Sequence, residues 1–104
     1  MADTRTDAEL VVAARGGDQQ AFAAIYDRYA DRVFGLCTTV TRDRGIAEDA
    51  TAETFLSAWN RLEQLREPAQ LRAWLFAIAR NRAIKLGTRA AKLVPTDTLA
   101  DTVS

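Results

Sequence analysis

Hydrophobic side chains recur along this chain every three or four residues, which is the spacing of one face of an α-helix. The longest such stretch covers residues 22–40. Its predicted core positions are Phe22, Ile25, Tyr26, Tyr29, Val33, Leu36, Cys37 and Val40. No segment shows the alternation with a period of two that half-buried strands have. The pattern therefore predicts an all-α protein.

Residues that begin and end helices divide the pattern into about four segments. Helices are predicted over residues 7–15, 19–40, 46–62 and 68–86. Three aspartates are expected to cap the first three helices, namely Asp7, Asp18 and Asp43. Their carboxylates can accept hydrogen bonds from the free amides of a first turn. Gly87 should weaken any continuation of the fourth helix to residue 92. Short connections between the helices favour a compact bundle of about four helices.

The other three helices also have expected inward positions. These are Leu10, Val11 and Ala14 in the first, Ile46, Ala50, Phe55, Ala58, Trp59 and Leu62 in the third, and Leu71, Trp74, Leu75 and Ile78 in the fourth. The spacing of Trp74 favours the core, with one edge of the ring exposed. The alternative is that this ring stacks on an unpaired base.

The composition removes most catalytic chemistries. Histidine is absent and Cys37 is the single cysteine, which leaves no imidazole base, no disulfide framework and few ways to build a metal or haem site. Asp49 and Glu53 would need further ligands to hold a divalent ion, and the sequence offers none nearby. We therefore expect neither an enzyme nor a cofactor. A lone thiol, a polar start and no apolar run of about 20 residues predict a cytoplasmic protein without a membrane span.

Charge is unevenly distributed, although the chain has 14 basic and 14 acidic side chains. Residues 1–67 carry 8 basic and 12 acidic side chains, whereas residues 68–92 carry 6 basic and none acidic. A basic segment suits a polyanion such as nucleic acid. The acidic part suits a different partner, so the asymmetry predicts two partners.

One candidate surface lies on the third helix. Its residues share the side turned away from Phe55 and Trp59, and they are Asp49, Ala52, Glu53, Leu56 and Asn60. Two acids beside an exposed leucine would suit a basic helical partner, with affinity from the apolar centre and register from the charged rim. On spacing alone, an ordinary solvated helix face is the simpler interpretation.

A second candidate surface lies on the fourth helix. One basic stripe forms there if the helix persists, and it consists of Arg82, Lys85, Arg89 and Lys92, with Asn81 beside it. Cations on one face bind phosphates, and an asparagine amide both donates and accepts at a base edge. The alternative is a solubilising face whose cations complement the helix dipole. The lack of acids in this segment favours nucleic acid.

A series of short motifs runs along most of the chain. The motifs are Gly17-Asp18, Ala21-Phe22, Tyr26-Asp-Arg-Tyr29, Ala47-Glu-Asp49, Glu53-Thr-Phe-Leu56, Ala58-Trp59, Leu71-Arg-Ala-Trp-Leu75 and Ile78-Ala-Arg-Asn-Arg-Ala83. Together they resemble region 2 of the extracytoplasmic-function sigma factors, over residues 7–92, and their order and spacing make the resemblance specific. The resemblance implies a helical domain that binds core RNA polymerase and melts the minus-ten element of a promoter.

The resemblance also implies a role for each candidate residue. Asp49, Ala52, Glu53, Leu56 and Asn60 would contact the clamp coiled coil of the polymerase's largest subunit. The loop of residues 65–70 and the start of the fourth helix would hold the single-stranded minus-ten element, with an extruded base in a pocket of the loop. The implied DNA contacts are Leu65, Arg66, Arg72, Trp74, Arg80, Asn81, Arg82, Lys85 and Arg89. An anti-sigma factor is a further partner that the family implies.

The chain departs from the family pattern in places. Ala52 stands where many members have glutamine, and Leu65 and Glu67 stand where an aromatic residue and a glycine are frequent. Family members also carry a second helical domain, whose helix-turn-helix reads the minus-thirty-five element. We therefore expect a region 2 domain over residues 1–92 and the start of an interdomain linker over residues 93–104, in a truncated chain. The competing hypothesis is a helical protein-interaction module that does not bind nucleic acid.

Overall fold

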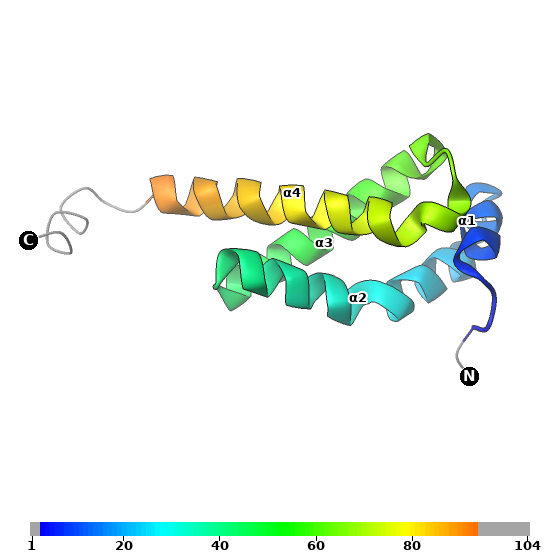
Figure 1. Cartoon of the computed structure of the whole chain (residues 1–104), viewed down its shortest axis with the longest axis horizontal. Helices are drawn as coiled ribbons and strands as arrows, with labels where there is room; N and C mark the ends of the chain where they lie inside the picture. The colour runs from blue at the N-terminus through cyan, green and yellow to red at the C-terminus, as the bar shows by residue number, and fades with distance from the viewer. Residues whose placement is uncertain (1–2, 94–104) are drawn as a thin grey trace, which may run out of the picture.

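The computed structural model describes residues 3–93 as a bundle of α-helices, as the hydrophobic pattern predicts. The elements are α1 (Asp7–Arg15), α2 (Gln19–Thr41), α3 (Arg44–Arg61), the 3-10 turns η1 (Leu62–Gln64) and η2 (Pro68–Gln70), and α4 (Leu71–Lys92). Helices α2 and α4 run in the same direction, α3 runs back against both, and α1 lies across one end (Figure 1). Within the described residues, no helix combines the length and the apolar character needed to cross a bilayer.

Two of the three predicted helix caps are confirmed. The Asp18 carboxylate accepts hydrogen bonds from the first turn of α2, and the Asp43 carboxylate accepts one from the first turn of α3. The predicted cap at Asp7 is wrong, because Thr6 caps α1 instead. The Thr6 hydroxyl accepts from the Glu9 amide at 3.1 Å, and the Glu9 carboxylate accepts from the Thr6 amide at 3.0 Å. This reciprocal pair satisfies two free amides at once, whereas the Asp7 carboxylate is bound to Arg28 and Tyr29.

The expected interruption at Gly87 does not occur. Helix α4 continues through this glycine to Lys92, and its last turn extends past the end of α2 (Figure 1). A Cβ placed on Gly87 would lie 3.8 Å from Thr41 Cγ2, so the glycine lies against the end of α2. A single glycine costs a helix only about 1 kcal/mol, which neighbouring contacts can offset. Of the predicted linker, residues 94–104 lie outside the described residues.

The core follows one stripe on each helix, and most predicted core positions are buried there. On α2 the buried residues are Ala21, Ile25, Tyr29, Val33 and Cys37, and on α4 they are Leu71, Leu75, Ala79 and Ala83. Three predicted core residues are instead exposed, because they lie beside these stripes: Tyr26 (46 %), Val40 (36 %) and Trp59 (40 %). The Tyr26 ring still packs edge-on against Phe55, with the ring centroids 4.7 Å apart.

Much of the buried surface between the helices consists of small side chains. The alanines and threonines of α3 in the core are Ala47, Ala50, Thr51, Thr54 and Ala58. The hydroxyl groups of Thr51 and Thr54 donate to carbonyls one turn earlier, at 2.8 Å and 2.7 Å, so they need no partner on another helix. Cys37 is fully buried beside the backbone of α4, and burial raises the pKa of its thiol. Small residues let the helices approach closely.

Asp7 joins α1 to α2. Its carboxylate accepts from the Arg28 guanidinium at 2.9 Å and from the Tyr29 hydroxyl. Arg28 also donates to the carbonyls of Asp3 and Arg5, each at 2.8 Å. Burial and the hydrogen bond to Asp7 raise the pKa of Tyr29, so its hydroxyl stays protonated as a donor. The N-terminal segment is thereby fixed against the side of α2.

We expect Asp7→Asn to lower the free energy of unfolding by about 1–3 kcal/mol, because it removes the charge that pairs with the half-buried Arg28. Urea unfolding followed by circular dichroism measures the change. Asp31→Asn is the matched control, because Asp31 is an exposed aspartate of α2 and is expected to leave stability within about 0.5 kcal/mol. Equal stability of both variants would contradict a stabilising role for Asp7.

Candidate functional site

The predicted surface on α3 exists as a continuous exposed face, which we call the α3 docking face. It consists of Asp49, Ala52, Glu53, Leu56 and Asn60. All of these are exposed except Glu53, which is half-buried, and Leu56 has 62 % of its surface exposed. Both carboxylates precede the exposed leucine on this side of α3, so the face has an acidic end followed by an apolar part.

The apolar part of this face is larger than the sequence indicated. The Trp59 ring packs edge-on against Phe22, with the ring centroids 4.9 Å apart and the planes at 69°. These two rings line a shallow hollow together with Gln19, Phe55 and Leu56. The exposure of Trp59 could have been anticipated from its residue type, because tryptophan is seldom fully buried and is enriched at protein interfaces.

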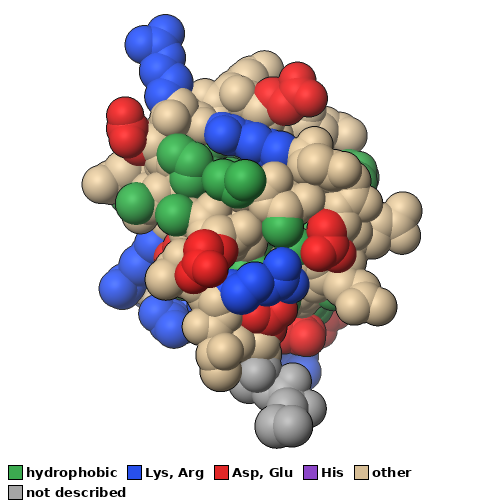
Figure 2. Space-filling view, turned by 90° about the vertical axis from the view of Figure 1, so that its right-hand side faces the viewer, with side chains coloured by type: hydrophobic (Ala, Val, Ile, Leu, Met, Phe, Trp, Pro, Cys, Tyr) green, Lys and Arg blue, Asp and Glu red, His purple; other side chains and the backbone are tan. Residues whose placement is uncertain are grey.

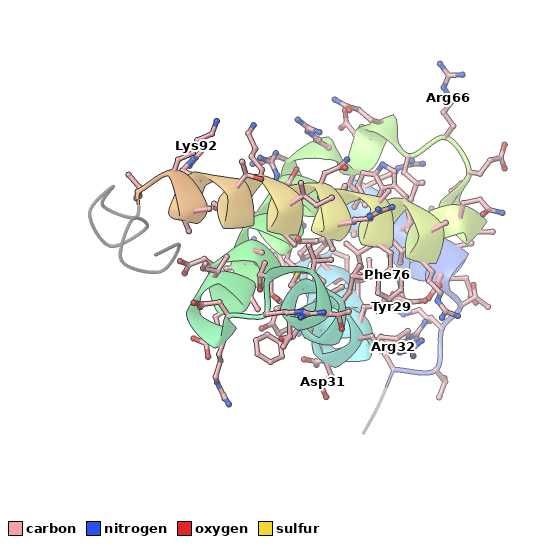
Figure 3. The ribbon with its side chains drawn as sticks, turned by 60° about the vertical axis from the view of Figure 1, so that its left-hand side comes forward. Tyr29, Asp31, Arg32, Arg66, Phe76 and Lys92 are labelled. Atoms are coloured by element: carbon pink, nitrogen blue, oxygen red, sulfur yellow. The ribbon has the colours of Figure 1, made fainter. Side chains whose placement is uncertain are left out.

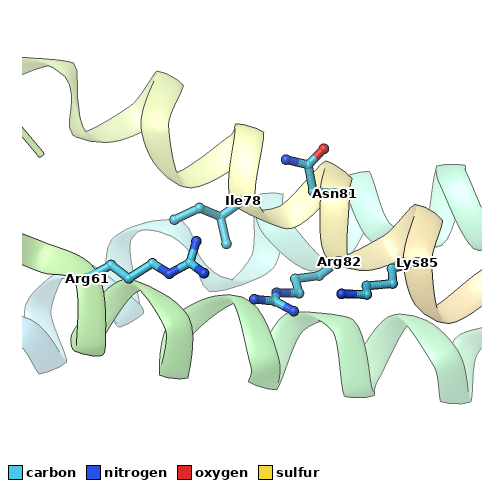
Figure 4. A pocket seen from close by; sticks show the side chains of 5 residues that line it. All are labelled: Arg61, Ile78, Asn81, Arg82 and Lys85. Atoms are coloured by element: carbon cyan, nitrogen blue, oxygen red, sulfur yellow. The ribbon is translucent and has the colours of Figure 1, made fainter. Parts of the chain in front are cut away.

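The second hollow lies between α3 and α4 and is mainly basic. Its lining residues are Arg61, Ile78, Asn81, Arg82 and Lys85, and its volume is about 210 Å³. Arg61 reaches from α3 towards α4, whereas Arg82 and Lys85 reach from α4 towards α3 (Figure 4). The structure therefore brings together three of the predicted α4 residues and adds Arg61. Sequence spacing gave no signal for Arg61, because it belongs to a different helix.

The two predicted surfaces are neighbours. A further hollow of about 260 Å³ is lined by Glu53, Leu56, Ser57, Asn60, Arg61 and Arg82. It combines residues of the α3 docking face with Arg82 of the basic stripe, so one groove joins the two surfaces. By contrast, acidic and basic side chains are interspersed at the end of the molecule where α1 lies (Figure 2).

Comparison with known proteins assigns the family. Residues 25–92 match the family described as sigma-70 region 2. The chain belongs to this family. It is 41 % identical over 70 residues to a probable RNA polymerase sigma factor, RfaY, of Xanthomonas campestris. It is also 39 % identical over 70 residues to the ECF RNA polymerase sigma factor SigK of Mycobacterium tuberculosis.

The matched segment covers most of this region 2 chain but little of its relatives. It takes up 67 % of this chain and 18 % of RfaY, and 66 % of this chain and 37 % of SigK. No solved structure matches the chain. The relatives and the fold agree with the resemblance to region 2 of an extracytoplasmic-function sigma factor.

Leu65 is not available for the DNA contact that the sequence predicted. Its side chain is 4 % exposed and belongs to the core of the region 2 domain. A leucine between two 3-10 turns anchors the loop by burying its apolar side chain, so a DNA contact by that side chain is wrong. Arg66 is exposed and extends away from the helices (Figure 3).

Arg15 holds the same loop from α1. Its Nε donates to the Leu62 carbonyl at 3.1 Å, and its Nη2 donates to the Leu65 carbonyl. These bonds join residues that lie 47 and 50 positions apart in the sequence. The loop that carries Arg66 is therefore fixed on both sides, by the Leu65 side chain inside and by the Arg15 guanidinium outside.

The remaining predicted DNA residues lie on several sides of α4. The Arg72 guanidinium lies over the Phe76 ring, 5.7 Å from its centroid, and Trp74 is half-buried against the core. Arg80 is exposed, but two residues on a helix turn its side chain about 200° away from Arg82. Arg89 is exposed on the same side as Arg82, about 10 Å further along the helix. Only part of the predicted set therefore shares one surface.

We expect Arg15→Met to loosen the loop, because it removes the donor to two loop carbonyls while keeping an apolar stem. Amide hydrogen exchange of residues 65–70 should accelerate, and the free energy of unfolding should fall by about 1–3 kcal/mol. Arg66→Met is the control, because it makes the same substitution at an exposed residue of the loop itself. Exchange that is unchanged in Arg15→Met would show that the two hydrogen bonds do not hold the loop.

Proposed function

We propose that this domain binds core RNA polymerase through the α3 docking face and holds the melted non-template strand of a promoter minus-ten element along α4. The observation that carries the proposal is the exposure of two chemically different surfaces on either side of one groove. One surface has carboxylates beside an apolar patch, and the other has cations and an amide. This role places the protein in the cytoplasm and requires no catalysis.

The polymerase contact is argued from the α3 docking face. Leu56 and Trp59 are exposed by 62 % and 40 %, which supplies apolar area that a partner can cover. Asp49 and Glu53 lie one turn apart on the same helix and set the charge of the rim. A basic coiled coil, such as the clamp helices of the largest polymerase subunit, would be opposite in charge to this surface and could cover its apolar part.

The DNA contact is argued from the basic hollow. Arg82 and Lys85 can neutralise phosphates and release counterions, which gives affinity without sequence preference. Asn81 can donate and accept hydrogen bonds at a base edge, which adds sequence preference. Because the Leu65 side chain is buried, a pocket for an extruded base would be formed by the loop backbone and exposed side chains such as Arg66.

Melting then follows from preferential binding. Extruding a base costs a few kcal/mol, and stacking returns about 1–3 kcal/mol per base, to which phosphate contacts add. A protein that binds the open strand more tightly than the duplex shifts the equilibrium towards the open form. The polymerase supplies the remaining contacts, and an anti-sigma factor that covers either surface would prevent initiation.

We expect weak binding to single-stranded DNA that decreases steeply with salt, and loss of this binding in Asn81→Ala with Arg82→Ala. The probe is a fluorescein-labelled single strand with a randomised central hexamer, measured by fluorescence anisotropy. The logarithm of the affinity should fall with the logarithm of salt by about 0.7 for each phosphate contacted. Gln20→Ala with Arg44→Ala removes an exposed amide and an exposed arginine elsewhere and serves as the control. Equal binding by all three proteins would favour a protein-interaction module.

We expect Asp49→Lys with Glu53→Lys to weaken capture by an immobilised clamp coiled-coil fragment about tenfold or more, because the charge at the rim is reversed. Asp27→Lys with Asp31→Lys is the matched control, with two exposed carboxylates at the same spacing on α2. Both variants should keep the helical circular-dichroism spectrum of the wild type. If the two variants are captured equally well, the α3 docking face is not the polymerase contact.

A further inference from the structure

Arg61 is a cation that the DNA-contacting set on α4 does not include. It is the last residue of α3 and is exposed. Its side chain crosses towards α4 and ends beside Ile78, on the side from which Arg82 and Lys85 approach (Figure 4). The end of one helix thereby supplies a guanidinium to a surface that the other helix forms.

The chemistry of this hollow is that of an anion site. Three of its five lining residues are cations, one is an amide and one is aliphatic. Across residues 3–93, the ion pairs of the structure involve other side chains and leave Arg61, Arg82 and Lys85 without a carboxylate partner. Like charges that lie close together repel one another, and an anion between them relieves that repulsion. A volume of about 210 Å³ is large enough for a phosphate group and its water.

We infer that Arg61 binds a backbone phosphate of the single strand, in a site shared with Arg82 and Lys85. The inference rests on the proposed contact between α4 and DNA, and it names a phosphodiester as the ligand. A guanidinium suits this ligand because its planar fork can donate two parallel hydrogen bonds to phosphate oxygens. Asn81 lies at the same hollow, so the phosphate would be held next to the base whose edge Asn81 can reach.

The phosphate site would also lie next to the proposed polymerase contact. Arg61 follows Asn60 of the α3 docking face directly, and both line the neighbouring hollow with Glu53 and Arg82. The carboxylate of Glu53 disfavours a phosphate at that border. A basic group of the polymerase that pairs with Glu53 would offset part of this repulsion. Binding at the docking face would then favour the phosphate at the adjacent site.

A purely structural role for Arg61 is the competing explanation. A cation in the last turn of a helix complements the helix dipole, and Arg61 occupies that position in α3. That role would change the thermal midpoint and leave binding to DNA unaltered. Measurement of both quantities on the same variants separates the two explanations.

The test compares four substitutions at three arginines of this chain, with a fluorescein-labelled 15-mer of deoxythymidine as the probe. Arg61→Gln is expected to weaken binding about three- to tenfold at low salt and to reduce the salt slope by about 0.7, as one lost phosphate contact does. Arg82→Gln should do the same. Arg44→Gln is the control, because Arg44 lies at the other end of the same helix, about 25 Å away. Arg61→Lys should keep the salt slope, since it keeps the charge.

Three results would overturn the inference, and they differ in what they say about the proposed function. If Arg82→Gln weakens binding while Arg61→Gln matches Arg44→Gln, Arg61 is not part of the site and the α4 contact stands. If all three glutamine variants weaken binding equally, the effect is one of overall charge and the hollow is not a site. If the wild-type chain does not bind the probe at all, the proposed DNA contact fails together with the inference.

Discussion

The close packing of small residues between the helices is the constraint on which the other features depend. Along α4 the buried residues change from leucine to alanine, in the order Leu71, Leu75, Ala79 and Ala83, and the buried side of α3 is largely alanine and threonine. Helices with small side chains at their contact can lie close together, and threonine hydroxyls that bond within their own helix add no unpaired polar group. A bulky side chain in this contact would separate the helices and widen the groove between them.

That proximity explains why the two candidate surfaces meet. Acidic residues of α3 and basic residues of α4 would lie on separate sides of a looser bundle, whereas here Glu53, Asn60 and Arg82 line one hollow. The overall charge of zero conceals this arrangement, because the acids and bases cancel in number but not in position. A boundary between surfaces of opposite sign suits a domain that binds one protein and one nucleic acid at the same time.

Helix α1 connects α2 to the loop before α4. Helix α1 is fixed to α2 by the contacts of Asp7 with Arg28 and Tyr29, and Arg15 at its other end holds the carbonyls of the loop before α4. The loop thus depends on residues about fifty positions away. The family resemblance implies that the loop side chains contact DNA, yet Leu65 is buried and acts as an anchor. A rigid backbone with exposed flanking residues is a suitable base for binding an unpaired nucleotide.

The sequence alone determined the helical class, the extent of the first three helices to within a few residues, two of the three predicted caps and the family, because these depend on local spacing and on short-range hydrogen bonds. The fourth helix, predicted over residues 68–86, instead spans Leu71–Lys92. Helical periodicity also predicted the exposure of Asp49, Ala52, Leu56 and Asn60 on one side of α3. Glu53 is half-buried, and Leu56 shares a hollow with Phe55 and Trp59, from which that side was expected to turn away. Only the tertiary structure decided that Trp59 is exposed, that Leu65 is buried, and that Arg61 joins the basic hollow. These outcomes depend on how one helix is rotated against another and how closely it approaches, and no single helix carries that information.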